Sequence, residues 1–212
     1  MVEFLKPDEV FLLQQMYLKN DLAHQWNHIE EVLKASKIIC ERLSIPYDKI
    51  IELAICMHDL MKWNEDNEPH QIAGYKNVFL IWSESLLPTL DECTIEEVKH
   101  IAICVREHRA KGHEGKFTSP QASVVAASDA GILNTNLEKV EKRIQRSIQY
   151  SLAKGKTPDK ARKDAVRHLH EKYGKGGYAY NKFSTLYKEA FANEIIIQQN
   201  LVEEYFNLHK ND

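Results

Sequence analysis

The stretch Ile51-Glu-Leu-Ala-Ile-Cys-Met-His58-Asp59 decides how the rest of this 212-residue chain is interpreted. Ile51, Ala54 and Ile55 recur with the spacing of an α-helix, and His58 falls on the same stripe one turn later. The run is almost wholly apolar, so we expect a buried helix that ends in two polar residues. Such residues need partners inside the protein, because burying an unpaired charge costs free energy.

The same helical periodicity runs through most of the chain, and no stretch alternates between apolar and polar residues long enough to suggest a β-strand. Helix starts are marked by Pro7, by a capping box at 94–97 and by Ser119-Pro120, and Asp21 is the expected N-cap of a second helix. We therefore predict an all-α fold, with helices at about 7–19, 21–43, 48–61, 69–87, 94–108, 119–133, 136–153, 157–173 and 182–207.

The composition is that of an ordinary globular protein, with 43% hydrophobic residues, 28% charged residues and a formal net charge of -3. This balance argues against disorder and against a general attraction to long nucleic acids. No apolar run is long enough to span a bilayer, the first residues do not resemble an export signal, and the four cysteines lack disulfide or zinc-knuckle spacing. We expect a cytoplasmic protein that does not bind membranes; nothing in the composition indicates its oligomeric state. It should form a single domain, 1–212, with a core over about 20–135 and a helical extension over about 136–212.

Four of the expected helices each carry one metal-binding side chain on an apolar face. These side chains are His28, His58, His108 and Asp129, and each lies three, four or seven residues from apolar positions of its own helix. A single histidine on an apolar face more often forms ordinary hydrogen bonds within the core than binds a metal. A buried aspartate is harder to accommodate, because an unpaired carboxylate there costs several kcal/mol. As a set, they indicate a metal site in a helical bundle, where inward-facing side chains commonly bind cations.

Asp59 follows His58 directly, and adjacent helix residues point about 100° apart. The pair can therefore reach one ion only near a helix end, or can reach two ions. Histidine and aspartate donors without thiolates suit Mn, Fe, Co, Ni or Mg, in contrast to a cysteine-rich structural zinc site.

Three motifs, in this order, resemble those of the HD-domain superfamily of metal-dependent phosphohydrolases. Residues 21–32, DLAHQWNHIEEV, resemble the opening motif, and residues 54–62, AICMHDLMK, resemble the defining histidine–aspartate motif. Ser128-Asp129-Ala130 resembles the closing aspartate. The tail from residue 171 onward is also similar to that of small bacterial members. The resemblance implies an HD-type helical bundle that hydrolyses a phosphoester or phosphoanhydride, most often in a nucleotide.

The resemblance also assigns roles to single residues. Asp59 or Asp129 would accept a proton from the attacking water, while Lys62, His108 or Arg109 would stabilise charge on the phosphate. One divalent metal ion would be held by His28, His58, Asp59 and Asp129.

Two substrate-binding assignments have a second interpretation. Lys62, expected near the substrate phosphate, could equally be a positive charge that complements a helix end. His24, one turn before His28, either faces the substrate or caps a surface turn.

Some members of the family bind a second ion through two further histidines, for which His70 and His108 are the candidates here. Residues 88–93 look inserted between them and lengthen the interval, so His70 is alternatively an ordinary polar residue at a helix start. We therefore predict one ion and keep the binuclear arrangement open.

Residues 139–175 contain twelve Lys or Arg against four Asp or Glu. Such a stretch is more often a solvated helix face, but it can also attract an anionic substrate. We expect the partner to be a small phosphorylated molecule, a nucleotide, and not a long nucleic acid. Two other classes stay open: a diiron HD-type oxygenase, which would consume dioxygen, and a non-catalytic helical binding module.

Overall fold

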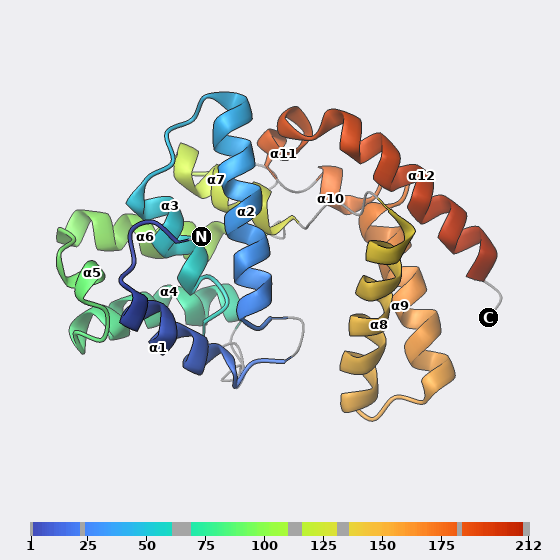
Figure 1. Ribbon diagram of the computed structural model, residues 1–212, viewed down its shortest axis with the longest axis horizontal. Coiled ribbons are helices and arrows are strands. Elements are labelled where there is room, and N and C mark those ends of the chain that lie inside the picture. The colour runs from blue at the N-terminus through green and yellow to red at the C-terminus, as the bar shows by residue number, and fades with distance from the viewer. Residues whose placement is uncertain are drawn as a thin grey trace.

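The computed structural model describes residues 2–21, 24–60, 69–109, 116–130, 136–181 and 184–209. Within these residues the protein is all-α, as the sequence predicts, and contains no β-strand (Figure 1). None of the helices described there is both long enough and apolar enough to cross a bilayer. The helices in chain order are α1 (Pro7–Tyr17), α2 (Trp26–Leu43), α3 (Lys49–Met57), α4 (His70–Ser83), α5 (Pro88–Asp91), α6 (Ile95–Glu107), α7 (Pro120–Asp129), α8 (Leu137–Ala153), α9 (Pro158–Tyr173), α10 (Tyr178–Asn181), α11 (Thr185–Ala190) and α12 (Ala192–His209).

Helix α3 lies at the centre of the N-terminal part of the molecule. Every residue from 51 to 60 is buried, and α3 contacts α2, α6 and α7. Asp48 begins the helix, because its side chain accepts a 2.9 Å hydrogen bond from the amide of Ile51. Burial of this nearly all-apolar helix carries the two polar residues at its end into the interior.

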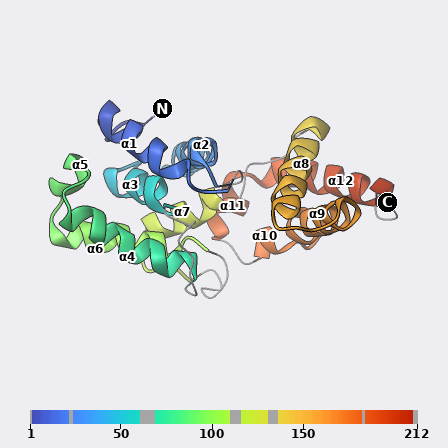
Figure 2. The same ribbon diagram turned by 90° about the horizontal axis from the view of Figure 1, so that it is seen from below.

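Helices α4 and α6 lie side by side, with the short α5 at one end of the pair (Figures 1 and 2). The predicted capping box begins α6: the Thr94 hydroxyl accepts from the Glu97 amide, and the Glu97 carboxylate accepts from the Thr94 amide. Ser119 and Asn136 cap α7 and α8 with their side chains. Several helices therefore begin at capping side chains that can be recognised in the sequence.

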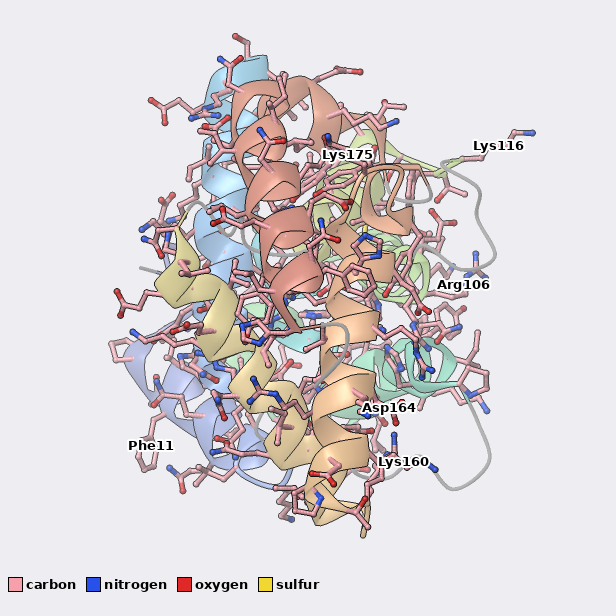
Figure 3. All side chains as sticks on the ribbon, turned by 90° about the vertical axis from the view of Figure 1, so that its right-hand side faces the viewer. Phe11, Arg106, Lys116, Lys160, Asp164 and Lys175 are labelled. Carbon is pink, nitrogen blue, oxygen red and sulfur yellow. The ribbon has the colours of Figure 1, made fainter. Side chains whose placement is uncertain are left out.

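The C-terminal helices form a second part beside this core (Figure 2). Helices α8 and α9 pack against each other, α12 packs on α9, and Figure 3 views these helices from outside. Helix α11 contacts α2 and α7, and a short hydrogen bond joins the hydroxyls of Ser123 and Ser184. Tyr173 of α9 adds a second connection, donating a 2.8 Å hydrogen bond to the carbonyl of Ala130.

The start of α2 differs from the prediction. The helix begins at Trp26, not after Asp21, and the capping side chain proposed at Asp21 is engaged elsewhere. Its carboxylate lies 2.8 Å from Nδ1 of His24. This local contact takes the place of the predicted cap, and the helix starts later.

The end of the chain also differs. The single helix predicted at 182–207 is interrupted at Phe191, between α11 and α12. The ring of Phe191 is buried, and Arg42 donates a 2.7 Å hydrogen bond to the carbonyl of Ala190. These tertiary contacts favour a turn where the sequence alone shows continuous helical periodicity.

Candidate metal centre

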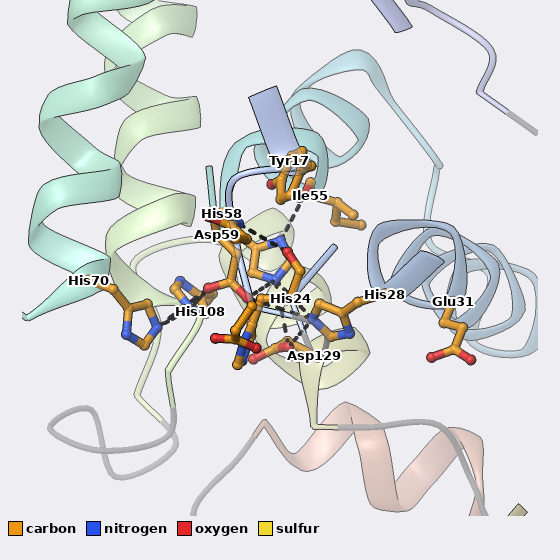
Figure 4. A network of polar contacts seen from close by, with 12 residues as sticks. Tyr17, His24, His28, Glu31, Ile55, His58, Asp59, His70, His108 and Asp129 are labelled. Carbon is orange, nitrogen blue, oxygen red and sulfur yellow. Dashed lines mark hydrogen bonds and ion pairs between the residues drawn. The ribbon is translucent and has the colours of Figure 1, made fainter. Parts of the chain in front are cut away.

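Six histidine and aspartate side chains converge where α2, α3, α4, α6 and α7 meet (Figure 4). They come from helix ends: the first turns of α2 and α4, the last residue of α7, and the turns that follow α3 and α6. Five helices thus present their ends to one point inside the protein. The six residues are His28, His58, Asp59, His70, His108 and Asp129.

The first group consists of His28, His58 and Asp129, whose ligand atoms form a nearly regular triangle. The two Nε2 atoms are 3.3 Å apart, and Oδ1 of Asp129 lies 3.2 Å from that of His28 and 3.6 Å from that of His58. Donors bound ~2.1 Å from one ion at tetrahedral or octahedral angles are about 3.0–3.4 Å apart. The triangle therefore has the size that one divalent ion requires.

The second group consists of Asp59, His70 and His108, all buried. The Nε2 atoms of the two histidines are 3.2 Å apart, and Oδ1 of Asp59 lies 3.5 Å from that of His70 and 3.8 Å from that of His108. This triangle is only slightly larger than the first. Its side chains can hold a second cation after small movements.

Asp59 belongs to both groups. While its Oδ1 faces the second group, its Oδ2 lies 3.4 Å from Nε2 of His58 and 3.8 Å from Nε2 of His28. The four ligands predicted for one ion therefore do lie together. The same carboxylate also reaches the two histidines that the sequence left as an open alternative, so the geometry accommodates two adjacent cations with Asp59 between them.

The donor set fits divalent metal ions because backbone carbonyls orient two of the imidazoles. Nδ1 of His58 donates a 2.7 Å hydrogen bond to the carbonyl of Ile55, and Nδ1 of His108 donates a 2.6 Å hydrogen bond to that of Val105. In a neutral imidazole this fixes the proton on Nδ1 and leaves the lone pair on Nε2. Both lone pairs point into the cluster, and such second-partner hydrogen bonds are typical of metal-bound histidines.

The protonation states agree with metal binding at most positions. Burial would raise the pKa of Asp129, but hydrogen bonds from His28 and His58 hold it well below its usual range. Burial lowers the pKa of His28, and it lowers that of His108 to about 4. These groups are therefore a carboxylate and two neutral imidazoles near neutral pH, the forms that bind metals. His58 differs: burial opposes its charged form, but Asp59 and Asp129 raise its pKa to about 9, so an ion would displace its proton.

Two residues of the α1 end, which the sequence did not reveal, hold the histidine–aspartate pair in place. Helix α3 ends at Met57, earlier than predicted, so carbonyls near its end need other donors. The Tyr17 hydroxyl donates a 3.0 Å hydrogen bond to the carbonyl of Cys56, and the Asn20 amide donates a 2.9 Å hydrogen bond to that of Asp59. The only signal in the sequence was an Asn directly before the 21–32 motif.

The other predicted site residues are distributed as follows. Lys62 lies outside the described residues. His24 and Arg109 line a cleft that opens beside the cluster, with His24 paired to Asp21. His108, expected to stabilise charge on the substrate, instead has its two ring nitrogens directed at Val105 and at the second group.

His70 is no ordinary polar residue of a helix start, since it is buried and its Nε2 reaches that of His108. The apparent insertion at 88–93 does not separate the two. It contains α5, which lies at one end of the α4–α6 pair, whereas His70 and His108 lie at the other end (Figure 2). Because these helices pack side by side, extra residues between them leave the distance at the open ends unchanged.

The cleft beside the cluster has a volume of about 930 Å³. One of its walls includes His28, Asp59, His70, His108 and Asp129, and the opposite wall is formed mainly by α8 and α9. A bound molecule in this space would contact the cluster and the C-terminal helices together.

Comparison of the chain with models of protein families, with curated proteins and with solved structures finds no match. The function must therefore be inferred from the molecule's own geometry. The cluster provides donors for cations, and the cleft provides the space in which a substrate could reach them.

Proposed function

We propose that this protein is a metal-dependent phosphohydrolase of the HD-domain type, with two divalent ions in its active centre. One observation carries the proposal: the histidines and aspartates of the HD-like motifs converge on two adjacent groups that share Asp59. Paired metal sites of this kind are used for phosphoryl transfer by phosphatases and nucleases. The cationic wall of the cleft supports a phosphorylated substrate.

When bound, the two ions would activate a water molecule and neutralise charge on the scissile phosphate. Asp129, whose side chain is 19% exposed, lines the cleft and would orient the attacking water and accept its proton. Asp59 is only 4% exposed, and its two carboxylate oxygens face the two groups of ligands, one oxygen to each group. Arg109, exposed at the edge of the cleft, would bind a phosphate oxygen.

The donor chemistry favours transition metals. Four imidazole nitrogens and two carboxylates suit Mn, Fe, Co or Ni better than Mg, which prefers an all-oxygen shell. The proposed substrate is a nucleotide or another small phosphoester or phosphoanhydride.

The proposal is tested by phosphate release from a panel of nucleotides with Mn, Co, Ni and Mg, using protein purified without chelator. His58→Ala and Asp59→Ala should reduce turnover to background and lower the metal content, because each removes a donor from the cluster. His209→Ala and Asp159→Ala are the matched controls, since they change the same residue types outside the cluster. Wild-type turnover by either cluster variant with metal bound would show that the pair is not the catalytic centre.

The second group supports one other candidate. Two histidines and one carboxylate are also the donor set of many Fe(II) oxygenases. Dioxygen uptake by the iron-loaded protein, without phosphate release from any nucleotide, would favour an HD-type oxygenase. If neither phosphate release nor dioxygen uptake is detected, a non-catalytic binding module is favoured.

A further inference from the structure

The wall of the cleft opposite the metal centre is rich in cations. Lysines and arginines of α8 and α9 line it, and Arg109 adds one more from the end of α6. Acidic residues balance some of them: Arg146 pairs with Glu31 at 3.6 Å, and Arg167 pairs with Asp164 at 2.7 Å. Part of the positive stretch 139–175 therefore faces the metal centre.

Two of these cations lie over the ring of Tyr173. This side chain is 1% exposed, and its hydroxyl donates to the carbonyl of Ala130, the residue that follows Asp129. The Arg143 guanidinium lies 4.7 Å from the centre of the ring, and the Lys172 ammonium lies 5.0 Å from it. The buried ring therefore contacts two positive charges and, through its hydroxyl, the residue that follows a proposed metal ligand.

Arg109 is a third cation of the same cleft, which Tyr178 also lines. Burial raises the pKa of the Tyr178 hydroxyl, whereas the charges of Lys172, Arg143 and Arg109 act in the opposite direction. The pKa of His168 is lowered by burial and by Lys172. Cations from α9, α8 and the end of α6 therefore line the same cleft.

Like charges gathered in a partly enclosed cleft repel one another, and a bound anion relieves that repulsion. The cleft, at about 930 Å³, is near the upper end of the range of about 300–1,000 Å³ for small-molecule sites. It has room for a ligand that extends from the metal centre to the opposite wall.

We propose that Arg143, Lys172 and Arg109 form a second anion-binding subsite, which takes the distal phosphates of a linear oligophosphate. The inference rests on the proposed phosphohydrolase function for the other end of the substrate, where the scissile phosphate reaches the metal centre. The two guanidinium groups can bind phosphate in a bidentate manner, and the ammonium adds a point charge. Nucleoside triphosphates and inorganic tripolyphosphate share this chemistry, whereas a monophosphate would engage one end of the cleft only.

Binding of inorganic tripolyphosphate to the full chain after metal removal, measured by calorimetry, tests the subsite independently of catalysis. The Arg143→Gln/Lys172→Gln variant should bind at least about tenfold more weakly than wild type, because it loses two charge-assisted contacts. Lys160→Gln/Lys163→Gln removes an equal number of positive charges from exposed positions of α9 outside the cleft and should bind like wild type. Figure 3 shows Lys160. Arg143→Lys keeps the positive charge over Tyr173 but cannot bind phosphate in the bidentate manner of a guanidinium group, so an intermediate affinity is expected.

In the metal-loaded protein, the same double variant should lose at least about tenfold in kcat/KM for a nucleoside triphosphate and clearly less for a monophosphate, which loses only the long-range attraction. If the nucleoside triphosphate binds more tightly than tripolyphosphate, the ligand is a nucleotide. If the two affinities are equal, the subsite recognises the oligophosphate alone. Equal tripolyphosphate affinity in wild type and double variant, or no binding by wild type, overturns the subsite. Tighter binding of a single-stranded oligonucleotide also overturns it. If no phosphoester is hydrolysed but tripolyphosphate binding still depends on these side chains, the proposed function fails and the subsite stands.

Discussion

Replacement of Asn20 by alanine tests whether the end of α1 positions the histidine–aspartate pair. Asn20 is 5% exposed, and its side-chain amide donates 2.9 Å hydrogen bonds to the carbonyls of His24 and Asp59. Alanine removes both donors. The Asp59 carbonyl then loses this donor in the interior, next to a residue that both ligand groups share.

The expected effect follows from the environments of the two carbonyls. A buried acceptor that loses its hydrogen bond costs about 1–3 kcal/mol. The bond to Asp59 is buried and takes the upper part of that range, while the carbonyl of His24 is only part-buried, so its loss adds at most about 1 kcal/mol. We therefore expect Asn20→Ala to lower the free energy of unfolding by about 2–4 kcal/mol. Loosening of Asp59 should also weaken metal binding about 10–100-fold, as loss of an outer hydrogen bond typically does.

Urea unfolding of the metal-free protein gives the first quantity, and calorimetric titration with Mn²⁺ gives the second. Asn27→Ala, at an exposed position in the first turn of α2, is the matched control and should stay within about 0.5 kcal/mol of wild type. An Asn20→Ala variant as stable as that control would refute the hydrogen-bonding argument. A destabilised variant with unchanged Mn²⁺ affinity would refute the positioning role alone.

Three further predictions concern other parts of the molecule. Tyr17→Phe removes the donor to the Cys56 carbonyl and should lower the free energy of unfolding by about 1–2 kcal/mol in the same urea experiment; an unchanged midpoint would contradict this. Raising the salt from about 0.01 M to about 1 M shortens the Debye length from ~30 Å to ~3 Å, so kcat/KM for a nucleotide should fall steadily, and a flat profile would argue against electrostatic attraction by the cleft. At pH 8 a thiol reagent should label no cysteine of the folded protein and all four after unfolding, since each is buried. Burial raises the thiol pKa at every one of them, to about 11 for Cys40 and to about 12 for Cys104.

The parts of the fold that depend on local chemistry were predictable from the sequence. Thr94 with Glu97 predicted the start of α6, and the apolar stripes showed which histidines point inward. A local signal was misleading where a second local interaction competed with it. Asp21 has the chemistry of a helix cap, but its carboxylate contacts His24 instead, and α2 starts later.

The features that depend on tertiary packing were not predictable. The sequence separation of His70 and His108 suggested distance, but the α4–α6 pair places the extra residues at its far end. That Asp59 faces both groups of ligands was also not predictable, because the sequence cannot show which way its two oxygens point. Likewise, the positive charge of 139–175 was evident, yet only the packing of α8 and α9 shows that part of it faces the cluster.

The stoichiometry of metal binding tests the binuclear centre most directly. Titration of the metal-free protein with Mn²⁺, with the metal content of the product measured separately, should give two ions per chain, one for each group of ligands. His70→Ala removes a donor from the second group only, so this variant should retain a single ion. One ion in the wild-type protein, or two ions in His70→Ala with unchanged affinity, would contradict the account.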